Sequence, residues 1–414
     1  MIRWIIFVAL IGIADYYAFQ SLKTVTKSNW WYAIYWIFTV VVIGNFIFQF
    51  YGFNRSSGFS QSNALAVGFL IALVVPKLIL MTLMFAEDVF RVPQGIYSYF
   101  MQDDSASGNQ IKHFPSRRSF ISQIGLGLAA IPFASILYGM YKGKYNFKVL
   151  KYTLYFEDLP QAFDGYRLTQ ISDIHSGSFD NIKKVEYAID LINKQESDVI
   201  LFTGDMVNDK AEEMKPYIDI FKNLNAKDGL YSILGNHDYG DYVRWDSGEE
   251  KKQNLENLKV IQKEIGFDLL LNENRFIEKE GERIALVGVE NWGKGGFKKA
   301  GDLKKASSNI SKEDFKILLT HDPSHWEEQV INDDYHYHLT LSGHTHGMQF
   351  GIEIPGWFKW SPVKWRYKYW AGIYEELGQY INVNRGFGYL AFPGRVGIWP
   401  EITVIELKKG QKEA

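Results

Sequence analysis

The sequence predicts a membrane region in residues 1–145, followed by an α/β domain in residues 146–414. Three observations lead to this expectation. Long runs without charge fall within the first 141 residues, and none follows them. From about residue 146, short apolar runs alternate with charged stretches that have a helical period. Polar side chains of the kinds that bind metal ions come directly after several of these short runs.

The composition excludes several kinds of site. The chain of 414 residues contains no cysteine, which excludes disulfides, thiolate zinc sites and thiol catalysis. Any metal ion would therefore be held by His, Asp, Glu or Asn. The formal net charge of −2 gives no indication of a nucleic-acid partner, and none is expected.

Four apolar runs predict about four transmembrane helices and a multi-pass membrane protein. Each run is long enough to cross roughly 30 Å of hydrocarbon as a helix. The first is the weakest because Asp15 interrupts it, and the third contains Lys77. One such run alone is also compatible with a buried helix of a soluble core. The runs are residues 4 to about 22, 30–51, 63–86 and 119–141.

The charges that flank these runs favour a domain outside the cytoplasm. Basic residues are enriched in cytoplasmic loops, so we expect the first–second and third–fourth connections to lie in the cytoplasm. The other face then holds Arg3, Arg55 and the α/β domain. The basic residues of the two cytoplasmic connections are Lys23, Lys27, Arg91, Lys112, Arg117 and Arg118.

Two further patterns disagree about the side of the membrane. The segment "SRRSFIS" (116–122), before an apolar run, resembles a twin-arginine export signal, which directs a folded domain outward. An ordinary arginine pair at the membrane edge is the alternative. A group of lysines after the last run argues for the opposite orientation, so an extracytoplasmic domain is favoured while the other side stays open. These lysines are Lys142, Lys144, Lys148 and Lys151.

The α/β domain begins with a strand–helix–strand unit. Strands are predicted at residues 166–172 and 198–204. Between them, residues 181–195 place Val185, Ile189 and Ile192 on one face of a helix. Further strands are predicted at 229–235, 283–289, 315–320, 337–343, 380–386 and 401–407.

Metal-binding residue types follow five of these strands. The carboxyl ends of strands are where open α/β sheets place their sites. In an extended chain, residues i and i+2 point the same way, so His344 and His346 are expected to enter one site. Each motif alone is compatible with a turn or a surface histidine, but together they predict a metal centre. The residues are Asp173, His175, Asp205, Asn236, His237, Asp238, His321, His344 and His346.

The order D-x-H, G-D, G-N-H-D, H and G-H-x-H resembles that of the calcineurin-like metallophosphoesterases, over residues 148–410. The segments "NVNRGFG" and "RVGIWPEITVIEL" are similar to a subgroup of membrane-attached or twin-arginine-exported phosphohydrolases. That subgroup is related to enzymes that cleave UDP-2,3-diacylglucosamine. The resemblance implies a four-layer αββα sandwich. One departure is Met348, where the subgroup has the second glycine of G-H-T-H-G-G-Q, and it puts the shape of this loop in question.

The resemblance also implies a two-metal phosphoesterase. Two divalent ions, Mn²⁺, Fe²⁺ or Zn²⁺, would share an activated hydroxide and offset the charge of the phosphoryl group. Asp173, His175 and His346 would bind the first ion. Asn236, His321 and His344 would bind the second, with Asp205 bridging the two. His237 would donate a proton to the leaving oxygen or stabilise the transition state, and Asp238 would orient His237.

The substrate is the least determined part of this prediction. A phosphate ester or a pyrophosphate bond is expected, with a lipid-linked substrate such as UDP-2,3-diacylglucosamine as one candidate. Arg385 and Arg395 are candidates for gripping the phosphate. Residues 357–380 combine aromatic and basic side chains, which suits a membrane interface. A ligand-sensing protein without turnover and a structural metal-binding membrane protein remain alternatives, and the oligomeric state is open.

Overall fold

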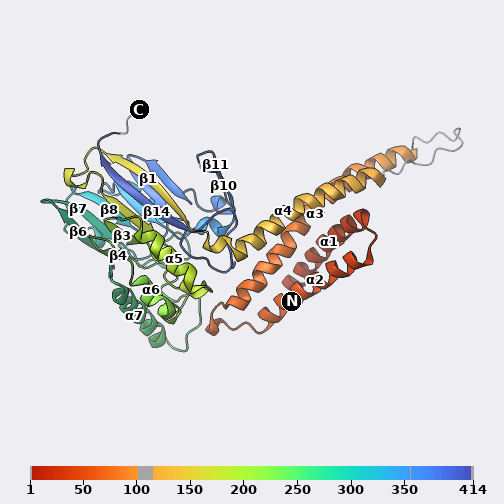
Figure 1. The fold of residues 1–414 in the computed structure, drawn as a ribbon, viewed down its shortest axis with the longest axis horizontal. Coiled ribbons are helices and arrows are strands. Elements are labelled where there is room, and N and C mark those ends of the chain that lie inside the picture. Colours follow the sequence, from red (N-terminus) through yellow and green to blue (C-terminus); the bar gives the residue numbers. More distant parts are fainter. Residues whose placement is uncertain (1, 101–114, 355, 412–414) are drawn as a thin grey trace. The chain divides into compact units, whose positions relative to one another are not determined.

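The computed structural model describes residues 2–100, 115–354 and 356–411. Contacts divide the chain into two units, which are coloured along the sequence in Figure 1. The helical unit comprises Met1–Phe53 and Ser62–Tyr138, and the sheet unit comprises Asn54–Gln61 and Gly139–Ala414. The expected division into residues 1–145 and 146–414 stays a prediction, and it did not anticipate the short segment Asn54–Gln61 in the sheet unit.

In the described part of the chain, four helices make up the helical unit, which ends at Tyr138, within the last helix. They are α1 (Ile2–Val25), α2 (Asn29–Tyr51), α3 (Gln61–Phe100) and α4 (Pro115–Tyr141). Within the described residues, three stretches are long and apolar enough to cross a membrane: Asn29–Tyr51, Gln61–Tyr97 and Arg118–Tyr141. Helix α1, which carries Asp15, is not among them. Lys112, one of the charges used to predict sidedness, lies outside the described residues.

A buried ion pair joins α1 to α3 in the helical unit. Lys77 Nζ contacts the carboxylate of Asp15 and lies 2.8 Å from Thr39 Oγ1. The Tyr35 hydroxyl donates to Asp15 Oδ1 at 2.7 Å. Lys77 and Asp15 are each only 5% exposed. The two charged residues that weakened two of the apolar runs therefore neutralise each other.

The sheet unit contains two six-stranded sheets. The first has the order β1-β14-β2-β3-β4-β5, and the second has the order β12-β13-β9-β8-β7-β6. The strands of the first are β1 (Lys148–Phe156), β14 (Glu401–Lys409), β2 (Arg167–Ile171), β3 (Val199–Phe202), β4 (Leu230–Ser232) and β5 (Phe267–Leu269). Those of the second are β12 (Gly372–Glu376), β13 (Gln379–Val383), β9 (Leu339–Ser342), β8 (Phe315–Leu319), β7 (Glu282–Gly288) and β6 (Glu273–Lys279).

The predicted strand–helix–strand unit is confirmed. Strands β2 and β3 pair in parallel, and α5 (Ile182–Asn193) connects them. The side chain of Asn181 caps α5 by accepting from the Lys184 amide. The helix buries Val185, Ile189 and Ile192, the face that the sequence predicts, against the first sheet.

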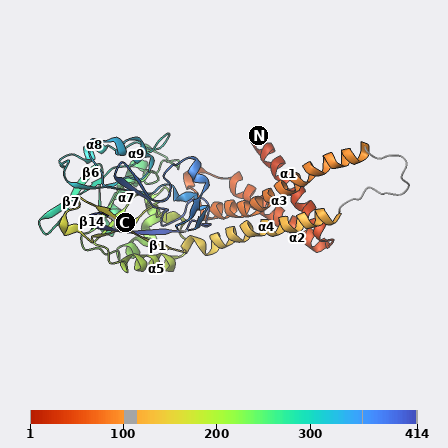
Figure 2. The same ribbon diagram turned by 90° about the horizontal axis from the view of Figure 1, so that it is seen from above.

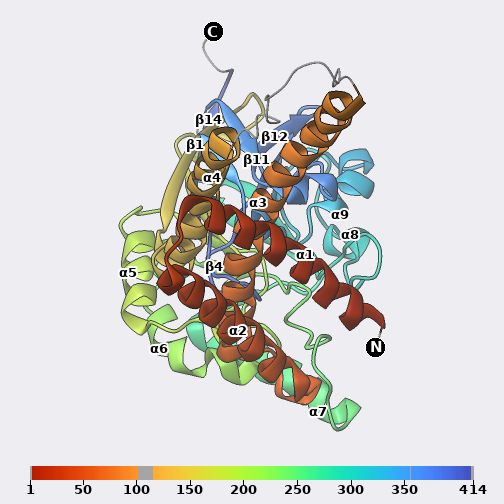
Figure 3. The same cartoon turned by 90° about the vertical axis from the view of Figure 1, so that its right-hand side faces the viewer.

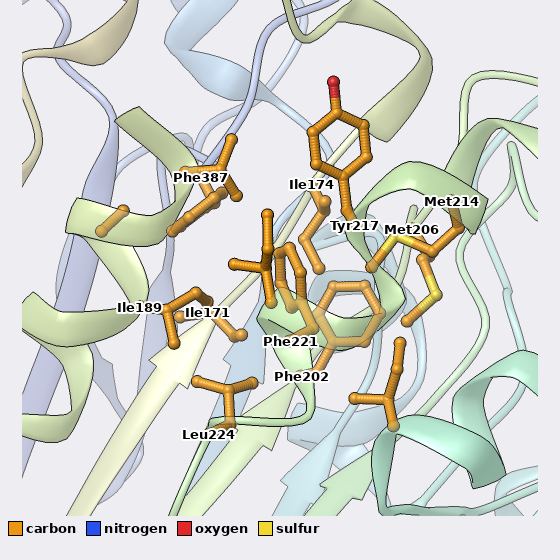
Figure 4. Close-up of a cluster of buried hydrophobic side chains, with 14 of the residues drawn as sticks. Ile171, Ile174, Ile189, Phe202, Met206, Met214, Tyr217, Phe221, Leu224 and Phe387 are labelled. Carbon is orange, nitrogen blue, oxygen red and sulfur yellow. The ribbon is translucent and has the colours of Figure 1, made fainter. Parts of the chain in front are cut away.

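Helices cover the outer faces of both sheets. α5, α6 (Ile218–Phe221) and α7 (Gly248–Ile265) pack on the first sheet through the apolar cluster drawn in Figure 4. α8 (Leu303–Ala306) and α9 (Ser324–Glu328) pack on the second. Figures 2 and 3 show these two helix layers on opposite sides of the strands. Between the sheets, apolar side chains of both inner faces form a third cluster. The expected four-layer αββα sandwich is confirmed.

Several strands were not predicted. β1, β5, β6 and β12 lie at or next to sheet edges, where aromatic and charged residues replace the continuous apolar runs of the central strands. A separate two-stranded sheet, β10 (Ile352–Ile354) with β11 (Phe358–Trp360), was also missed. The central strands, most of whose residues are buried, were all predicted.

Candidate metal centre

The residues predicted for the metal centre come from two sheets that face each other. Asp173 and His175 follow β2, Asp205 follows β3, and Asn236 lies beyond β4, all parallel strands of the first sheet. His321 follows β8, and His344 and His346 follow β9, parallel strands of the second sheet. Because parallel strands end at the same edge, each sheet presents its ligands on one side.

One cluster consists of Asp173, His175 and His346, all buried. The Nε2 atoms of His175 and His346 lie 3.0 Å apart. Asp173 Oδ1 lies 3.2 Å from Nε2 of His346. We call these residues the first cluster. They are the residues that the family resemblance assigns to the first ion.

The second cluster consists of Asp205, His321 and His344. His321 Nε2 lies 3.1 Å from Asp205 Oδ2 and 3.3 Å from His344 Nδ1. Asn236 Oδ1 lies 2.8 Å from the same His344 nitrogen, which places its amide beside the cluster. Asp205 Oδ2 is also 3.6 Å from Nε2 of His175. One oxygen of Asp205 therefore lies between the two clusters.

Both clusters suit a cation. They bring carboxylate oxygens and imidazole nitrogens to roughly 3 Å from one another, where lone pairs repel unless a proton or a metal ion lies between them. His321 Nδ1 lies 2.7 Å from the Thr203 carbonyl oxygen. Donation to this oxygen fixes the tautomer that leaves Nε2 free as a ligand. Oxygen and nitrogen ligands without sulfur fit Mn²⁺, Fe²⁺ or Zn²⁺.

The pKa values of the cluster residues also indicate a cation-binding site. Burial raises the pKa of Asp205, but His321 and His237 outweigh this and hold it well below its usual range. Burial lowers the pKa of His321, yet the Asp205 carboxylate outweighs it and raises this pKa to about 10. Burial lowers the pKa of His175 well below its usual value. The Asp205 carboxylate is therefore ionised, as a metal ligand must be.

The ligand-bearing backbone is locally strained. Asp173, His175, Asp205, His344 and His346 all have positive φ angles, between 47° and 70°. Non-glycine residues seldom adopt this conformation, which costs of order 1–3 kcal/mol and occurs mainly at functional sites. The backbone at His344 and His346 is not extended, as the sequence argument assumed, but both rings enter the site, and they lie in different clusters, as the family resemblance implies.

Gly343 permits the close approach of the two sheets at this point. A Cβ atom on Gly343 would lie 1.9 Å from Ser172 Oγ and 2.3 Å from Asp173 Oδ2. Both Asp173 carboxylate oxygens are 3.0 Å from the amide nitrogen of His344. Met348, the departure from the subgroup pattern, has φ 55° and ψ 14°. A glycine at this position would adopt the left-handed conformation without the strain that methionine incurs.

His237 lies between the first cluster and the ring of Tyr242. Its ring is 4.9 Å from that of His175 and packs at 4.3 Å on Tyr242. Nδ1 of His237 is 2.6 Å from the carbonyl oxygen of Asn208, so donation to this oxygen leaves Nε2 as the free nitrogen. Burial lowers the pKa of His237.

Asp238 does not have the predicted contact with His237. Its carboxylate oxygens accept hydrogen bonds from the amides of Asp205, Met206 and Gly235 at 2.8–2.9 Å. The carbonyl of Asn208, rather than Asp238, orients His237. The physical reason is that an aspartate three residues after Gly235 closes the turn and fastens it to the Asp205 loop. Burial and the Asp205 charge raise the pKa of Asp238 to about 7.

The two arginines predicted to bind substrate are bonded to protein groups. Arg385 pairs with Glu353 and Glu401 at 2.5 and 2.6 Å, and it is 3% exposed. Arg395 is fully buried and donates to the carbonyl oxygens of Arg385 and Gly388 at 2.6 and 2.9 Å. Its Nη2 lies 3.2 Å from His346 Nδ1. Contact of either arginine with substrate stays a prediction.

The residues around His344 were not predicted from the sequence. The Tyr367 hydroxyl lies 2.9 Å from His344 Nε2, and Asp322 Oδ2 is 3.4 Å from the same nitrogen. The Phe297 ring meets the His344 ring edge-on, with 4.8 Å between centroids. The side-chain amide nitrogen of Asn236 donates to the Tyr242 hydroxyl oxygen at 2.8 Å. Only Asp322, adjacent to His321, lay close to a predicted motif.

Comparisons with known proteins agree with this geometry. Residues 166–348 match the family model "Calcineurin-like phosphoesterase", and residues 2–144 match "Probable Calcineurin-like phosphoesterase, transmembrane domain". The chain is 29% identical over 299 residues to the uncharacterized metallophosphoesterase YkuE of Bacillus subtilis, covering 71% of this chain and 98% of that protein.

Two further relatives carry the same description. An uncharacterized metallophosphoesterase of Helicobacter pylori is 25% identical over 98% of both chains. A transmembrane protein with metallophosphoesterase domain from Danio rerio is 27% identical, over 66% of this chain and 60% of that protein. Family matches, fold and paired ligand clusters agree: the chain is a membrane-associated member of the calcineurin-like metallophosphoesterases, phosphoester hydrolases that generally use two divalent metal ions.

Proposed function

We propose that this enzyme hydrolyses the phosphoester or pyrophosphate bond of a lipid-linked substrate at two divalent ions. The observation that carries the two-ion part is the position of Asp205, whose Oδ2 lies within 3.6 Å of a histidine nitrogen in each cluster. Asp205 would be the shared ligand. Asp173, His175 and His346 would hold one ion, and Asn236, His321 and His344 the other.

Two divalent ions, when bound, would activate water and offset the charge of the phosphoryl group. The protein groups around them have separate tasks. Arg395 and the Thr203 carbonyl hold the rings of His346 and His321 in place. His237 Nε2 is the free nitrogen next to the first cluster, and its task would be to protonate the leaving oxygen or to stabilise its charge.

The proposed substrate class rests on charge and on membrane attachment. Two carboxylates, Asp173 and Asp205, oppose two dications, so the centre keeps a net positive charge that attracts an anionic group. An enzyme that is attached to a membrane has direct access to phosphorylated lipids in the same bilayer. UDP-2,3-diacylglucosamine is one candidate, and lipid monophosphates and diesters are others.

A phosphate-release screen tests this proposal. The full-length protein in nanodiscs would be assayed with Mn²⁺, Fe²⁺ or Zn²⁺ against nucleotides, lipid phosphates and UDP-2,3-diacylglucosamine, with Asp205→Asn as the inactive control. We expect turnover of at least one lipid substrate above that of the nucleotides. Turnover of nucleotides alone would overturn the lipid assignment and leave the phosphoesterase activity intact.

We further propose a multi-pass topology with the phosphoesterase domain outside the cytoplasm, supported by the loop charges and the "SRRSFIS" segment. Protease added to intact spheroplasts should then degrade the domain. If digestion requires lysis, the domain is cytoplasmic, and UDP-linked lipid precursors become the leading substrate candidates.

A further inference from the structure

The β10–β11 hairpin has the reverse of the usual arrangement of polar and apolar side chains. In the antiparallel pair, Ile352 is opposite Trp360 and Ile354 is opposite Phe358. Residues i and i+2 of a strand, and residues directly opposite in a pair, share one face. This face therefore consists of Ile352, Ile354, Phe358 and Trp360, and we call it the apolar face of the hairpin.

The apolar face is turned to the outside. Ile352, Ile354 and Phe358 are 56%, 44% and 48% exposed. Two neighbouring indoles extend this surface: Trp357 is 81% exposed, and Trp365, which packs edge-on against Trp360, is 76% exposed. Contiguous exposed apolar side chains of this size mark an interaction surface.

The opposite face of the hairpin is polar and turned inward. Glu353 accepts two hydrogen bonds from the buried guanidinium of Arg385, at 2.9 and 2.5 Å. Lys359 donates to the Ala371 carbonyl at 2.5 Å and lies 4.3 Å from the centre of the Tyr374 ring. A hairpin at a water-exposed surface places its polar face outward. Here specific bonds fix the polar face inside, so the apolar surface is not the result of a loosely held loop.

The position of the hairpin in the chain indicates what covers it. The Gly351 amide, at the base of β10, donates to the Val396 carbonyl at 2.9 Å, and the Arg395 amide donates to the Gly139 carbonyl at 3.2 Å. Gly139 belongs to Arg118–Tyr141, a stretch long and apolar enough to cross a membrane. The hairpin base is thus joined, through two adjacent residues, to the end of a candidate membrane span.

Basic side chains complete the pattern. Lys364 and Arg366 flank Trp365, are exposed, and form no ion pair within the described parts of the chain. Exposed tryptophan beside lysine and arginine is the composition of segments that lie at the boundary between lipid headgroups and acyl chains. We propose that the apolar face of the β10–β11 hairpin, with Trp357 and Trp365, inserts into the lipid bilayer to which the helices are anchored.

This insertion would hold the metal centre close to the headgroups. Met348, 56% exposed, follows the cluster residue His346 by two positions. Tyr367, two positions after Trp365, contacts His344 through its hydroxyl at 2.9 Å. The membrane surface would therefore be in contact with segments that border both clusters, whatever phosphoester is cleaved there.

The absence of natural cysteine allows a direct test with single-cysteine variants of the full chain. Trp357→Cys and Trp365→Cys would each be labelled with an environment-sensitive fluorophore and placed in nanodiscs of zwitterionic and anionic lipids. Val260→Cys on α7, which replaces a side chain that is 65% exposed on the same unit, is the matched control. Lipids that carry a quencher on the acyl chain report insertion.

We expect blue-shifted emission and strong quenching at positions 357 and 365, and neither at position 260. Emission at 357 and 365 that matches position 260 and is not quenched would overturn the proposal. Blue-shifted emission without lipid quenching would also overturn it and would assign the face to protein: to a second copy if energy transfer between labelled chains accompanies it, or to the helical unit if not. Two labelled positions guard against one variant that fails to fold.

Discussion

The helical unit and the sheet unit both bury charged groups, but they balance them differently. In the helical unit, Lys77 and Asp15 form an ion pair, so that one positive and one negative charge offset each other. The hydroxyl groups of Tyr35 and Thr39 complete the hydrogen bonds of this pair. In the sheet unit, the carboxylates of Asp173 and Asp205 lie among histidine nitrogens of both clusters, and within the described residues neither forms an ion pair with a lysine or an arginine. A buried pair whose charges already match leaves no charge for a ligand to neutralise, whereas buried carboxylates without a lysine or arginine partner mark a candidate cation-binding site.

The largest effect is expected for Asp205→Asn, which removes one buried negative charge from the metal centre. This variant tests whether the buried charges of the sheet unit serve to bind metal ions. Both clusters would lose the carboxylate that lies between them. We expect metal content to fall from two ions per chain, and turnover to fall by more than roughly 10⁴-fold, the upper range for loss of an acid–base group. Elemental analysis and phosphate release measure these effects. Retention of two ions and of turnover would contradict the shared-ligand role.

His237→Ala should separate catalysis from metal binding. His237 contacts the first cluster through ring packing with His175 but belongs to neither cluster. We expect two ions to remain and turnover to fall by roughly 10²–10⁴-fold. His237→Gln is the control for shape. If His237→Ala turns over like the unchanged protein, the assigned role is wrong.

Lys77→Met tests the buried ion pair of the helical unit. Removing one member of a buried pair leaves the other charge unpaired and costs about 3–5 kcal/mol, whereas replacing both is often neutral. We therefore expect Lys77→Met to lower the unfolding temperature in detergent, and the double variant Lys77→Met/Asp15→Leu to restore most of it. A double variant as unstable as the single one would show that the pair is more than a neutral structural unit.

Asp209 provides the smallest and most pH-dependent test, because it is buried and, within the described residues, forms no ion pair and belongs to neither cluster. Burial and the neighbouring Glu213 raise its pKa from 3.8 to about 7, which the nearby Lys210 only partly opposes. Between these two values the folded state retains a proton that the unfolded state releases, so stability falls as the pH rises through this window.

Asp209→Asn should therefore raise the unfolding temperature at pH 8, and the gain should shrink as the pH is lowered to 5. Thermal unfolding of the full-length protein at both pH values measures the difference. An equal gain at pH 5 and pH 8 would mean that the ionisation of Asp209 does not affect stability.

Much of the site was predictable because its residues follow a local rule. Each ligand comes just after a short apolar run, and the glycines next to Asp205 and His344 mark where the strands stop. The same rule found the central strands, since strands buried on both faces read as continuous apolar runs.

What the sequence did not reveal depends on contacts between distant residues. Nothing near Tyr367 indicates that its hydroxyl reaches His344. The role of Asp238 follows from the amides of another loop, and the pairing of Asp15 with Lys77 requires the packing of two helices. The hairpin was missed because its apolar and polar residues alternate over only three residues in each strand.

The segment Asn54–Gln61 has a consequence for how the chain threads through a bilayer. The Arg244 amide donates to the Arg55 carbonyl at 3.2 Å, and the Gln61 side chain donates to the Phe179 carbonyl at 2.9 Å. The chain thus leaves the sheet unit at Gln61 and returns to it at Gly139. A path that starts and ends in one compartment crosses the membrane an even number of times. An epitope inserted between Arg55 and Gln61 should therefore always report the same compartment as one at the carboxyl terminus, whichever compartment that is.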